Sequence, residues 1–154
     1  MKRFTFPLET ARRWRERQEE LEEVRLQALF VERRGIEDRA ESLATELEGE
    51  HRRIEDCSFD AVELARLDAF RGWATRERER LRRAAADCER RIEAQRAALL
   101  EARRRFQLVD RLREKSLLGW LRANAKEQED LAAELYLARR GGGMVRRPRP
   151  SAGS

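Results

Sequence analysis

Cysteine, histidine, proline and glycine are scarce in this sequence, and their scarcity excludes several kinds of functional site. The 154 residues include two cysteines, one histidine and three prolines. Cys57 and Cys88 lack the paired spacing of a zinc or redox motif, so we interpret both as free thiols in a reducing compartment. His51 has charged neighbours but no cluster of cysteines or aspartates around it, which indicates a surface residue and not a metal ligand.

Catalytic motifs and long apolar runs are also missing from the sequence. We find no glycine-rich phosphate loop and no serine paired with a general base, so we predict no enzymatic activity, no cofactor and no small-molecule substrate. The longest apolar run, residues 117–121, is far shorter than the ~20 residues that cross a bilayer. The first residues do not resemble a signal peptide, because arginines follow almost at once. We therefore expect a cytoplasmic protein.

Charged residues dominate what is present. They make up 42% of the sequence, against 40% hydrophobic residues, and this composition with helical periodicity is typical of a coiled coil. The net charge of +5 arises at the C-terminal end, where five arginines follow residue 138 without an acidic residue. Residues 141–154 are rich in glycine, proline, serine and arginine, and we predict a disordered tail. Its charge could serve solubility, an acidic protein surface or an anionic membrane, with nucleic acid the least favoured.

The second half of the sequence predicts one long helix, at about residues 61–140. Its apolar residues recur at steps of three and four, which is the spacing of a heptad seam. After Val109 the pattern shifts, because Arg113 and Ser116 fall where apolar residues were due, and then resumes. The predicted seam residues are Leu64, Leu67, Ala74, Leu81, Ala85, Cys88, Ile92, Gln95, Leu99, Ala102, Phe106 and Val109, then Leu117, Leu121, Asn124, Gln128, Leu131, Leu135 and Ala138.

The first half predicts a second helix, at about residues 7–55, because Pro7 suits only a first helical turn. Its seam has polar interruptions at Arg33 and Glu50. The predicted seam residues are Leu26, Leu29, Ile36, Ala40, Leu43, Leu47 and Ile54. A neighbouring stripe of Leu21, Val24, Ala28 and Val31 makes the apolar face broader than one partner helix needs.

The connection between the two helices lies at about residues 56–60. Asp60 followed by Glu63 predicts a helix N-cap with an acidic residue three positions on, as in a capping box. Two long helices joined by a short connection bury their seams by lying antiparallel. We therefore predict an all-α fold, a long antiparallel coiled-coil hairpin over residues 1–140. One continuous helix in a parallel dimer is the alternative.

Large aromatic residues occur at both ends of the predicted hairpin, where two helices cover such side chains only in part. They either complete the seam, as suits Phe106, or anchor partner proteins. The candidates at the open end are Phe4, Phe6, Trp14, Trp120 and Tyr136, and those near the connection are Phe59, Phe70 and Trp73.

Two segments make the chain resemble the flagellar export protein FliJ family. The opening Phe4-Thr5-Phe6-Pro7-Leu8-Glu9 is similar to the F-x-F-x-L-E start of the family, and a charged helix follows. Residues 112–115 (Leu-Arg-Glu-Lys), Trp120 and residues 126–128 (Lys-Glu-Gln) are similar to the family's Leu-Lys-x-Lys, aromatic, Glu-Gln order. The chain departs from the family after Leu131, where two alanines replace an acidic pair.

The resemblance implies a stalk-like component of the flagellar type III export apparatus, associated peripherally with the inner face of the cell membrane. Its implied partners are a hexameric export ATPase, a membrane export gate protein and export chaperones. We expect the ATPase to bind the open end and the gate to bind the tip. The candidate residues for the ATPase are Phe4, Phe6, Trp14, Trp120, Glu127, Gln128, Leu131 and Tyr136; those for the gate are Phe59, Phe70 and Trp73.

Three other functions remain open from the sequence. The chain could be the stalk of a related injection-type secretion system. It could instead be a structural coiled coil that self-associates through the stripe from Leu21 to Val31, or a module that binds nucleic acid through the arginine tail.

Overall fold

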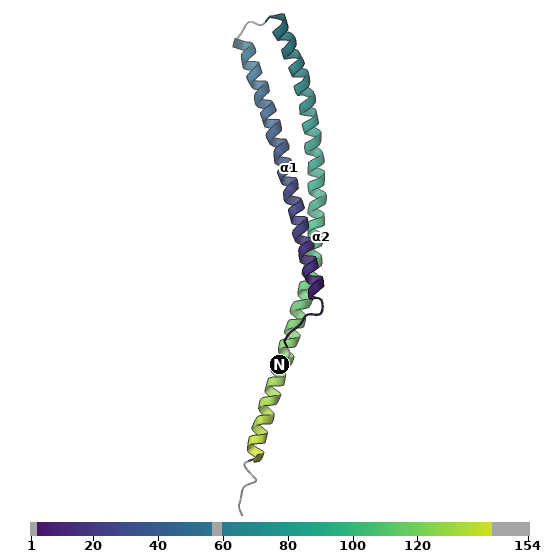
Figure 1. Ribbon diagram of the computed structural model, residues 1–154, viewed down its shortest axis with the longest axis vertical. Coiled ribbons are helices and arrows are strands. Elements are labelled where there is room, and N and C mark those ends of the chain that lie inside the picture. The colour runs from purple at the N-terminus through teal and green to yellow at the C-terminus, as the bar shows by residue number, and fades with distance from the viewer. Residues whose placement is uncertain (1–2, 57–59, 143–154) are drawn as a thin grey trace, which may run out of the picture. The chain divides into compact units, whose positions relative to one another are not determined.

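The computed structural model describes residues 3–56 and 60–142, and these residues form two helices without any strand. Helix α1 spans Glu9–Asp56 and helix α2 spans Ala61–Gly142, with 48 and 82 residues. Figure 1 shows them running side by side from their connection. The predicted all-α hairpin is therefore confirmed, whereas Cys57, Phe59 and the arginine tail beyond Gly142 lie outside the described residues.

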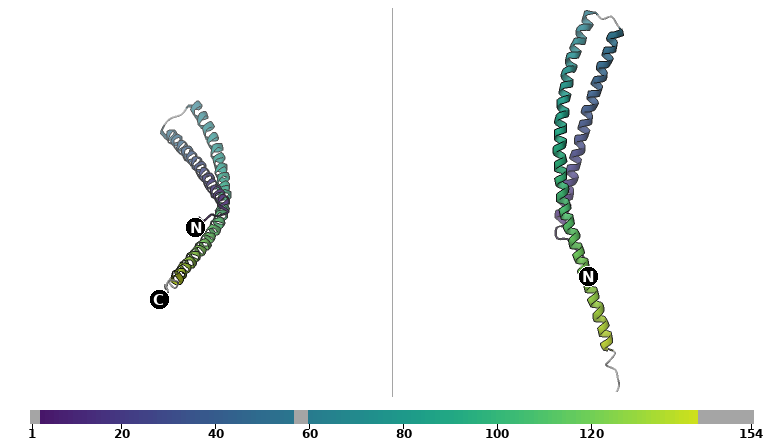
Figure 2. Two further views of the ribbon diagram at one scale, coloured as in Figure 1. Left: turned by 60° about the horizontal axis from the view of Figure 1, so that its bottom comes forward. Right: turned by 180° about the vertical axis from the view of Figure 1, so that it is seen from behind.

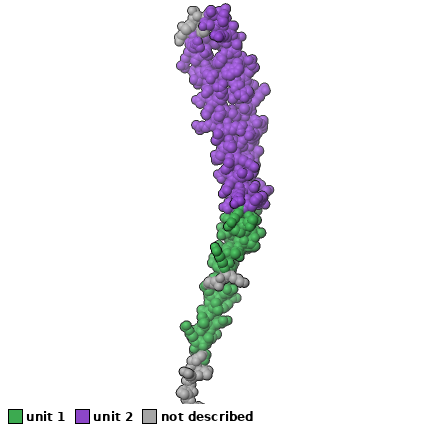
Figure 3. Space-filling view, in the orientation of Figure 1, with its two compact units in different colours: residues 1–13, 107–154 green, residues 14–106 purple. Residues whose placement is uncertain are grey.

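The chain divides into two compact units, which Figure 3 distinguishes by colour. We call Trp14–Phe106 the hairpin unit and Met1–Arg13 with Gln107–Ser154 the terminal unit. Each unit contains a stretch of both helices. We describe the two units separately.

The helices of the hairpin unit are antiparallel, as the views in Figure 2 also show. Contacts between them pair rising residue numbers in α2 with falling numbers in α1. The Cys88 thiol donates to the Leu29 carbonyl oxygen at 3.6 Å, and the Arg103 guanidinium donates to the Glu19 carboxylate at 3.1 Å. The predicted antiparallel arrangement therefore holds within this unit.

The core of the hairpin unit is a single seam along the two helices. One buried cluster holds Leu26, Cys88, Ile92 and Leu99, and a second holds Leu43, Ala74 and Leu81. All seven residues were predicted seam positions. The prediction was wrong for Ala40, which is exposed, and for Leu64, which is more than half exposed because the described seam begins one turn later, at Leu67.

The polar interruption at Arg33 is accommodated at the edge of this seam. Arg33 is half-buried, with a guanidinium nitrogen 3.8 Å from the Glu89 carboxylate of α2 and its guanidinium carbon 5.5 Å from the centroid of the Phe30 ring. The aliphatic stem can therefore cover apolar surface while the charged head reaches carboxylates at the rim. Arg33 interrupts the apolar pattern without leaving an isolated buried charge.

Local sequence signals set both helix starts. In α2, the Asp60 carboxylate accepts hydrogen bonds from the backbone N–H groups of Val62 at 2.9 Å and Glu63 at 2.8 Å. The Glu63 carboxylate accepts one from the Asp60 N–H at 3.4 Å, which completes the predicted reciprocal cap. Ahead of α1, the Glu9 N–H donates to the Phe6 carbonyl at 3.2 Å and closes a turn around Pro7, so α1 begins two residues later than predicted.

Within residues 3–56 and 60–142, neither helix contains a stretch long and apolar enough to cross a membrane.

Candidate functional site

Residues 3–8 lie against α2 within the terminal unit and are fixed there by aromatic packing. Phe6 is only 9% exposed and belongs to the core. Phe4 is half-buried, and its ring centroid lies 6.0 Å from that of Trp120 with the ring planes inclined by 56°. Tilted aromatic pairs at this separation are favourable. The burial of Phe6 argues for an anchoring role inside the chain, whereas Phe4 and Trp120 keep part of their surface accessible.

Ion pairs fill the position where the heptad pattern of α2 shifts. The Arg12 guanidinium donates a part-buried hydrogen bond of 2.8 Å to the Asp110 carboxylate. Arg113, at a position where an apolar residue was due, has its Nε atom 3.5 Å from a carboxylate oxygen of Glu9. Both contacts join α1 to α2 inside the terminal unit. The change of register is therefore a place where polar residues replace the apolar seam.

An open groove follows Trp120 along α2. It has a volume of about 600 Å³. Its lining consists of Arg3, Phe4, Thr5, Trp120, Ala123, Asn124 and Glu127. The groove combines aromatic surface with one guanidinium, one carboxylate, the Thr5 hydroxyl and the Asn124 amide. It can hold an apolar side chain between two opposite charges.

Beyond the groove, residues 125–141 continue α2 as a helix whose described side chains are all exposed, and we call this segment the C-terminal arm. Its large exposed hydrophobic residues are Leu131, Leu135, Tyr136 and Leu137. The predicted seam residues Gln128, Leu131, Leu135 and Ala138 are thus uncovered within the described chain. The physical reason is that the described N-terminal residues extend along α2 only as far as the groove.

The seam prediction also needs correction just before the arm. Leu121 was expected to point into the seam, but it is exposed, while its neighbour Trp120 is half-buried against Phe4. The predicted seam residues on either side, Leu117 and Asn124, are half-buried, so the difference is confined to this one turn. A partner helix would have favoured Leu121, but an extended N-terminal segment covers this face instead.

The candidate gate residues near the connection form a small aromatic surface in the hairpin unit. The ring centroids of Phe70 and Trp73 are 5.6 Å apart, with 32° between the planes. Phe70 also lines a groove of about 480 Å³ together with Leu47, His51 and Leu67. Phe59, the third predicted residue, lies outside the described residues.

Trp14 is exposed in the hairpin unit and lies under a cation. The Arg15 guanidinium carbon is 4.6 Å from the centroid of its ring, within the range of a cation–π contact. Trp14 also lines a shallow groove of about 250 Å³ with Ala98, Glu101 and Arg105. Its indole is therefore accessible to a partner from one side.

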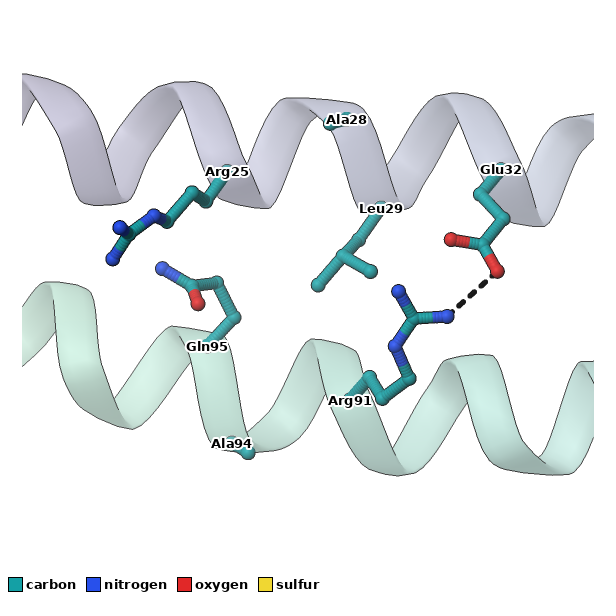
Figure 4. A pocket seen from close by; sticks show the side chains of 7 residues that line it. All are labelled: Arg25, Ala28, Leu29, Glu32, Arg91, Ala94 and Gln95. Carbon is teal, nitrogen blue, oxygen red and sulfur yellow. Dashed lines mark hydrogen bonds and ion pairs between the residues drawn. The ribbon is translucent and has the colours of Figure 1, made fainter.

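A further groove in the hairpin unit is lined by polar side chains that are hydrogen-bonded within the chain (Figure 4). It has a volume of about 470 Å³ and is lined by Arg25, Ala28, Leu29, Glu32, Arg91, Ala94 and Gln95. An Arg91 nitrogen donates to a Glu32 carboxylate oxygen at 2.7 Å across it. The Gln95 amide donates to the Glu22 carbonyl oxygen at 3.0 Å and to the Glu22 carboxylate. The polar groups satisfy one another and hold the helices in register.

The potentially reactive side chains are spread out. Burial, followed by the nearby Glu32 carboxylate, raises the pKa of the Cys88 thiol, so little thiolate is present at neutral pH. His51 is exposed on α1. Among residues 3–56 and 60–142, no group of three or more histidine, cysteine, aspartate or glutamate residues could hold a metal ion.

The sequence did not identify Arg3, Ala123 and Asn124 as neighbours in one groove. Asn124 was predicted only as a seam residue, and Arg3 directly precedes the opening motif. A predicted contact between Phe4 and Trp120 would have indicated this groove, because residues that flank such a contact line the same surface.

Comparison with known proteins adds no relative: no family model, no curated protein and no solved structure matches this chain.

Proposed function

We propose that the chain is a non-enzymatic, stalk-like component of the bacterial flagellar type III export apparatus. It would link a hexameric export ATPase to the membrane export gate protein and contact export chaperones. Its place would be the cytoplasm, peripherally at the inner face of the cell membrane. The proposal begins from the resemblance of the opening segment and of residues 112–128 to the FliJ family.

One structural observation supports the proposal in addition to the sequence resemblance. The two stretches that hold the resemblance are more than a hundred residues apart, yet Phe4 packs on Trp120, and both line one groove with Glu127. A sequence selected only for helix formation would not be expected to bring these two segments into contact. A binding surface to which both segments contribute would explain this contact.

The surface offered to the ATPase would consist of this groove and the C-terminal arm. Phe4, Trp120 and Glu127 contribute the groove, while Leu131 and Tyr136 stand exposed further along α2. Large apolar and aromatic side chains surrounded by charges are the groups that dominate binding energy at protein interfaces. Phe6 would act by holding the N-terminal segment in place.

The hairpin unit suits a connecting element because its helices bury a narrow seam and present charges elsewhere. The stretch of α2 inside this unit, residues 61–106, spans on the order of 70 Å at ~1.5 Å per residue. We assign the partly exposed aromatic pair of Phe70 and Trp73 to the gate.

The test is a titration of the purified cognate export ATPase with the chain, following ATP hydrolysis and hexamer formation. We expect the parent chain to promote both. Leu131→Ala with Tyr136→Ala removes two exposed anchors and should raise the half-maximal concentration roughly 5- to 30-fold.

The matched control is Leu100→Ala, which truncates an equally exposed leucine in the hairpin unit and should leave the titration unchanged. If the parent chain changes neither hydrolysis nor assembly, the proposed function is wrong. If the control weakens the effect as much as the arm variant does, the assignment of the ATPase to the arm is wrong.

A further inference from the structure

A second heptad seam on α1 stays exposed beside α2, although two of its members, Trp14 and Ala28, border grooves that α2 also lines. Trp14, Leu21, Val24, Ala28 and Val31 follow one another at three- or four-residue steps, with Arg17 filling the one gap. All are exposed, and the exposed fractions of Val24 and Val31 reach 65% and 74%. We call these residues the outer stripe.

The outer stripe is distinct from the seam that holds the hairpin together. Leu26 is buried and Leu29 is half-buried against α2, and these residues occupy the opposite side of α1 in a heptad. In Figure 4, Leu29, Arg25 and Glu32 reach toward α2, whereas the short Ala28 side chain lies at the outer edge of the groove that they line. A helix bound to the outer stripe would therefore leave the hairpin seam undisturbed.

Charged residues border the outer stripe on both sides, and these two flanks differ in whether their charges are paired. On the flank nearer α2, Arg25 pairs with Glu22 at 2.7 Å, and Glu32 pairs with Arg91 at 2.7 Å. On the other flank, Glu20 and Arg34 are exposed, and neither has an ion-pair partner among residues 3–56 and 60–142. This second flank thus keeps one unused negative charge and one unused positive charge, two heptads apart.

We infer that the outer stripe is a homodimerisation surface on which α1 of a second copy lies antiparallel. With the twofold axis at the level of Leu26, Leu21 faces Val31 of the second copy, and Val24 faces Ala28. Facing flank residues pair with each other in antiparallel coiled coils, so Glu20 lies beside Arg34 twice.

A parallel second copy does not give this match. Flank residues then pair about five positions apart, so Glu20 would lie beside Arg25 of the other α1, but Arg34 would lie beside Arg39 and repel it. A parallel copy would also place the two α1 dipoles side by side in the same direction, whereas the antiparallel arrangement opposes them. The unused charges therefore favour a second copy of this chain in the antiparallel direction. This inference does not rest on the proposed function.

The test is sedimentation equilibrium of the full chain over a wide range of concentrations. We expect a monomer–dimer equilibrium. Val31→Glu should raise the dissociation constant at least about tenfold, because it would place a carboxylate in both symmetric layers. Val62→Glu is the matched control, since Val62 is as exposed as Val24 but lies outside the stripe, and it should leave the constant unchanged. Circular dichroism should show the parent helix content for both variants.

Charge exchange tests the direction of pairing. Arg34→Glu should raise the dissociation constant by roughly two- to fivefold, because two exposed ion pairs with Glu20 become repulsive contacts. In a parallel dimer the same change would lower the constant, because the new carboxylate would lie beside Arg39. Glu20→Arg together with Arg34→Glu restores both pairs and should return the constant to its parent value. A chain that stays monomeric, a dimer unaffected by Val31→Glu, or a double exchange that fails to restore dimerisation each overturns the inference.

Discussion

The hairpin unit and the C-terminal arm have the same kind of sequence but contrasting environments. In the hairpin unit, apolar residues at three- and four-residue steps are buried against a second helix, as Cys88 and Ile92 are. In the arm, Leu131 and Leu135 follow the same spacing but are more than half exposed. Heptad spacing therefore predicts which face of a helix is apolar, but it does not predict what covers that face.

The difference has a thermodynamic consequence. A lone helical segment of 12 to 15 residues is only marginally stable in water, so most helix stability comes from packing. The arm lacks such packing in the described chain and depends on its continuity with α2. We therefore expect it to be the least stable part of the helix and the part that gains most from a partner.

The largest expected effect compares one truncation in the two regions. Leu43 is 1% exposed, whereas Leu131 is 59% exposed. Leu43→Ala should lower the free energy of unfolding by about 2–5 kcal/mol, because it removes buried contacts and leaves a cavity. Leu131→Ala should change it by less than about 0.5 kcal/mol. Urea denaturation followed by circular dichroism measures both, and equal losses would show that the arm is packed in solution.

Thiol reactivity compares the same regions without disturbing the seam. In a Cys57→Ser background, burial and the raised pKa of Cys88 should slow its alkylation at least about a hundredfold relative to the unfolded chain. Ala132→Cys, introduced into the arm with Cys88→Ser, should react at the rate of a free thiol. Fast labelling of Cys88 in the folded chain would mean that the seam opens readily.

A smaller effect is expected where α2 begins. Asp60→Ala removes the acceptor for the N–H groups of Val62 and Glu63, and it should cost about 1 kcal/mol of stability. Asp68→Ala, an exposed aspartate further along the same helix, is the control and should be nearly neutral. Thermal unfolding of the two variants measures the difference. An Asp60 variant as stable as the control would show that the cap contributes nothing in solution.

The smallest expected effect concerns an ion cluster on the exposed face of the hairpin unit. Hydrogen bonds from Arg82 and Arg83 lower the pKa of Glu79 from 4.5 to about 2. A lowered folded-state pKa stabilises the fold above pH 4.5, and this contribution fades as the pH falls toward 2. Glu79→Gln should therefore unfold at slightly lower urea concentration than the parent at pH 7 and at the same concentration near pH 2. A difference that persists at pH 2 would assign the effect to something other than this carboxylate.

Much of the architecture was predictable because its signals are local. The reciprocal cap of Asp60 and Glu63 and the spacing of Leu81, Cys88 and Ile92 need only a few consecutive turns of sequence. Antiparallel pairing then followed from the short connection. Each of these predictions depends on helix geometry, which is the same in every protein.

The candidate site was less predictable because it depends on which segments meet. The sequence named Phe4 and Trp120 separately, but only the structure brings their rings together. The burial of Phe6 and the exposure of Leu121 follow from an extended segment that heptad periodicity cannot represent. The ion pair of Arg12 and Asp110 likewise requires the stagger of the two helices to be known.

The most direct test of the proposed binding role is hydrogen exchange of the chain with and without the export ATPase. In the free chain, amides of residues 125–141 should exchange much faster than those around Cys88 and Ile92, because the arm has no packing partner in the described chain. Addition of the ATPase should slow exchange in the arm and beside Trp120 while the hairpin seam stays unchanged. A complex that forms while the arm keeps exchanging at its free rate would contradict the account.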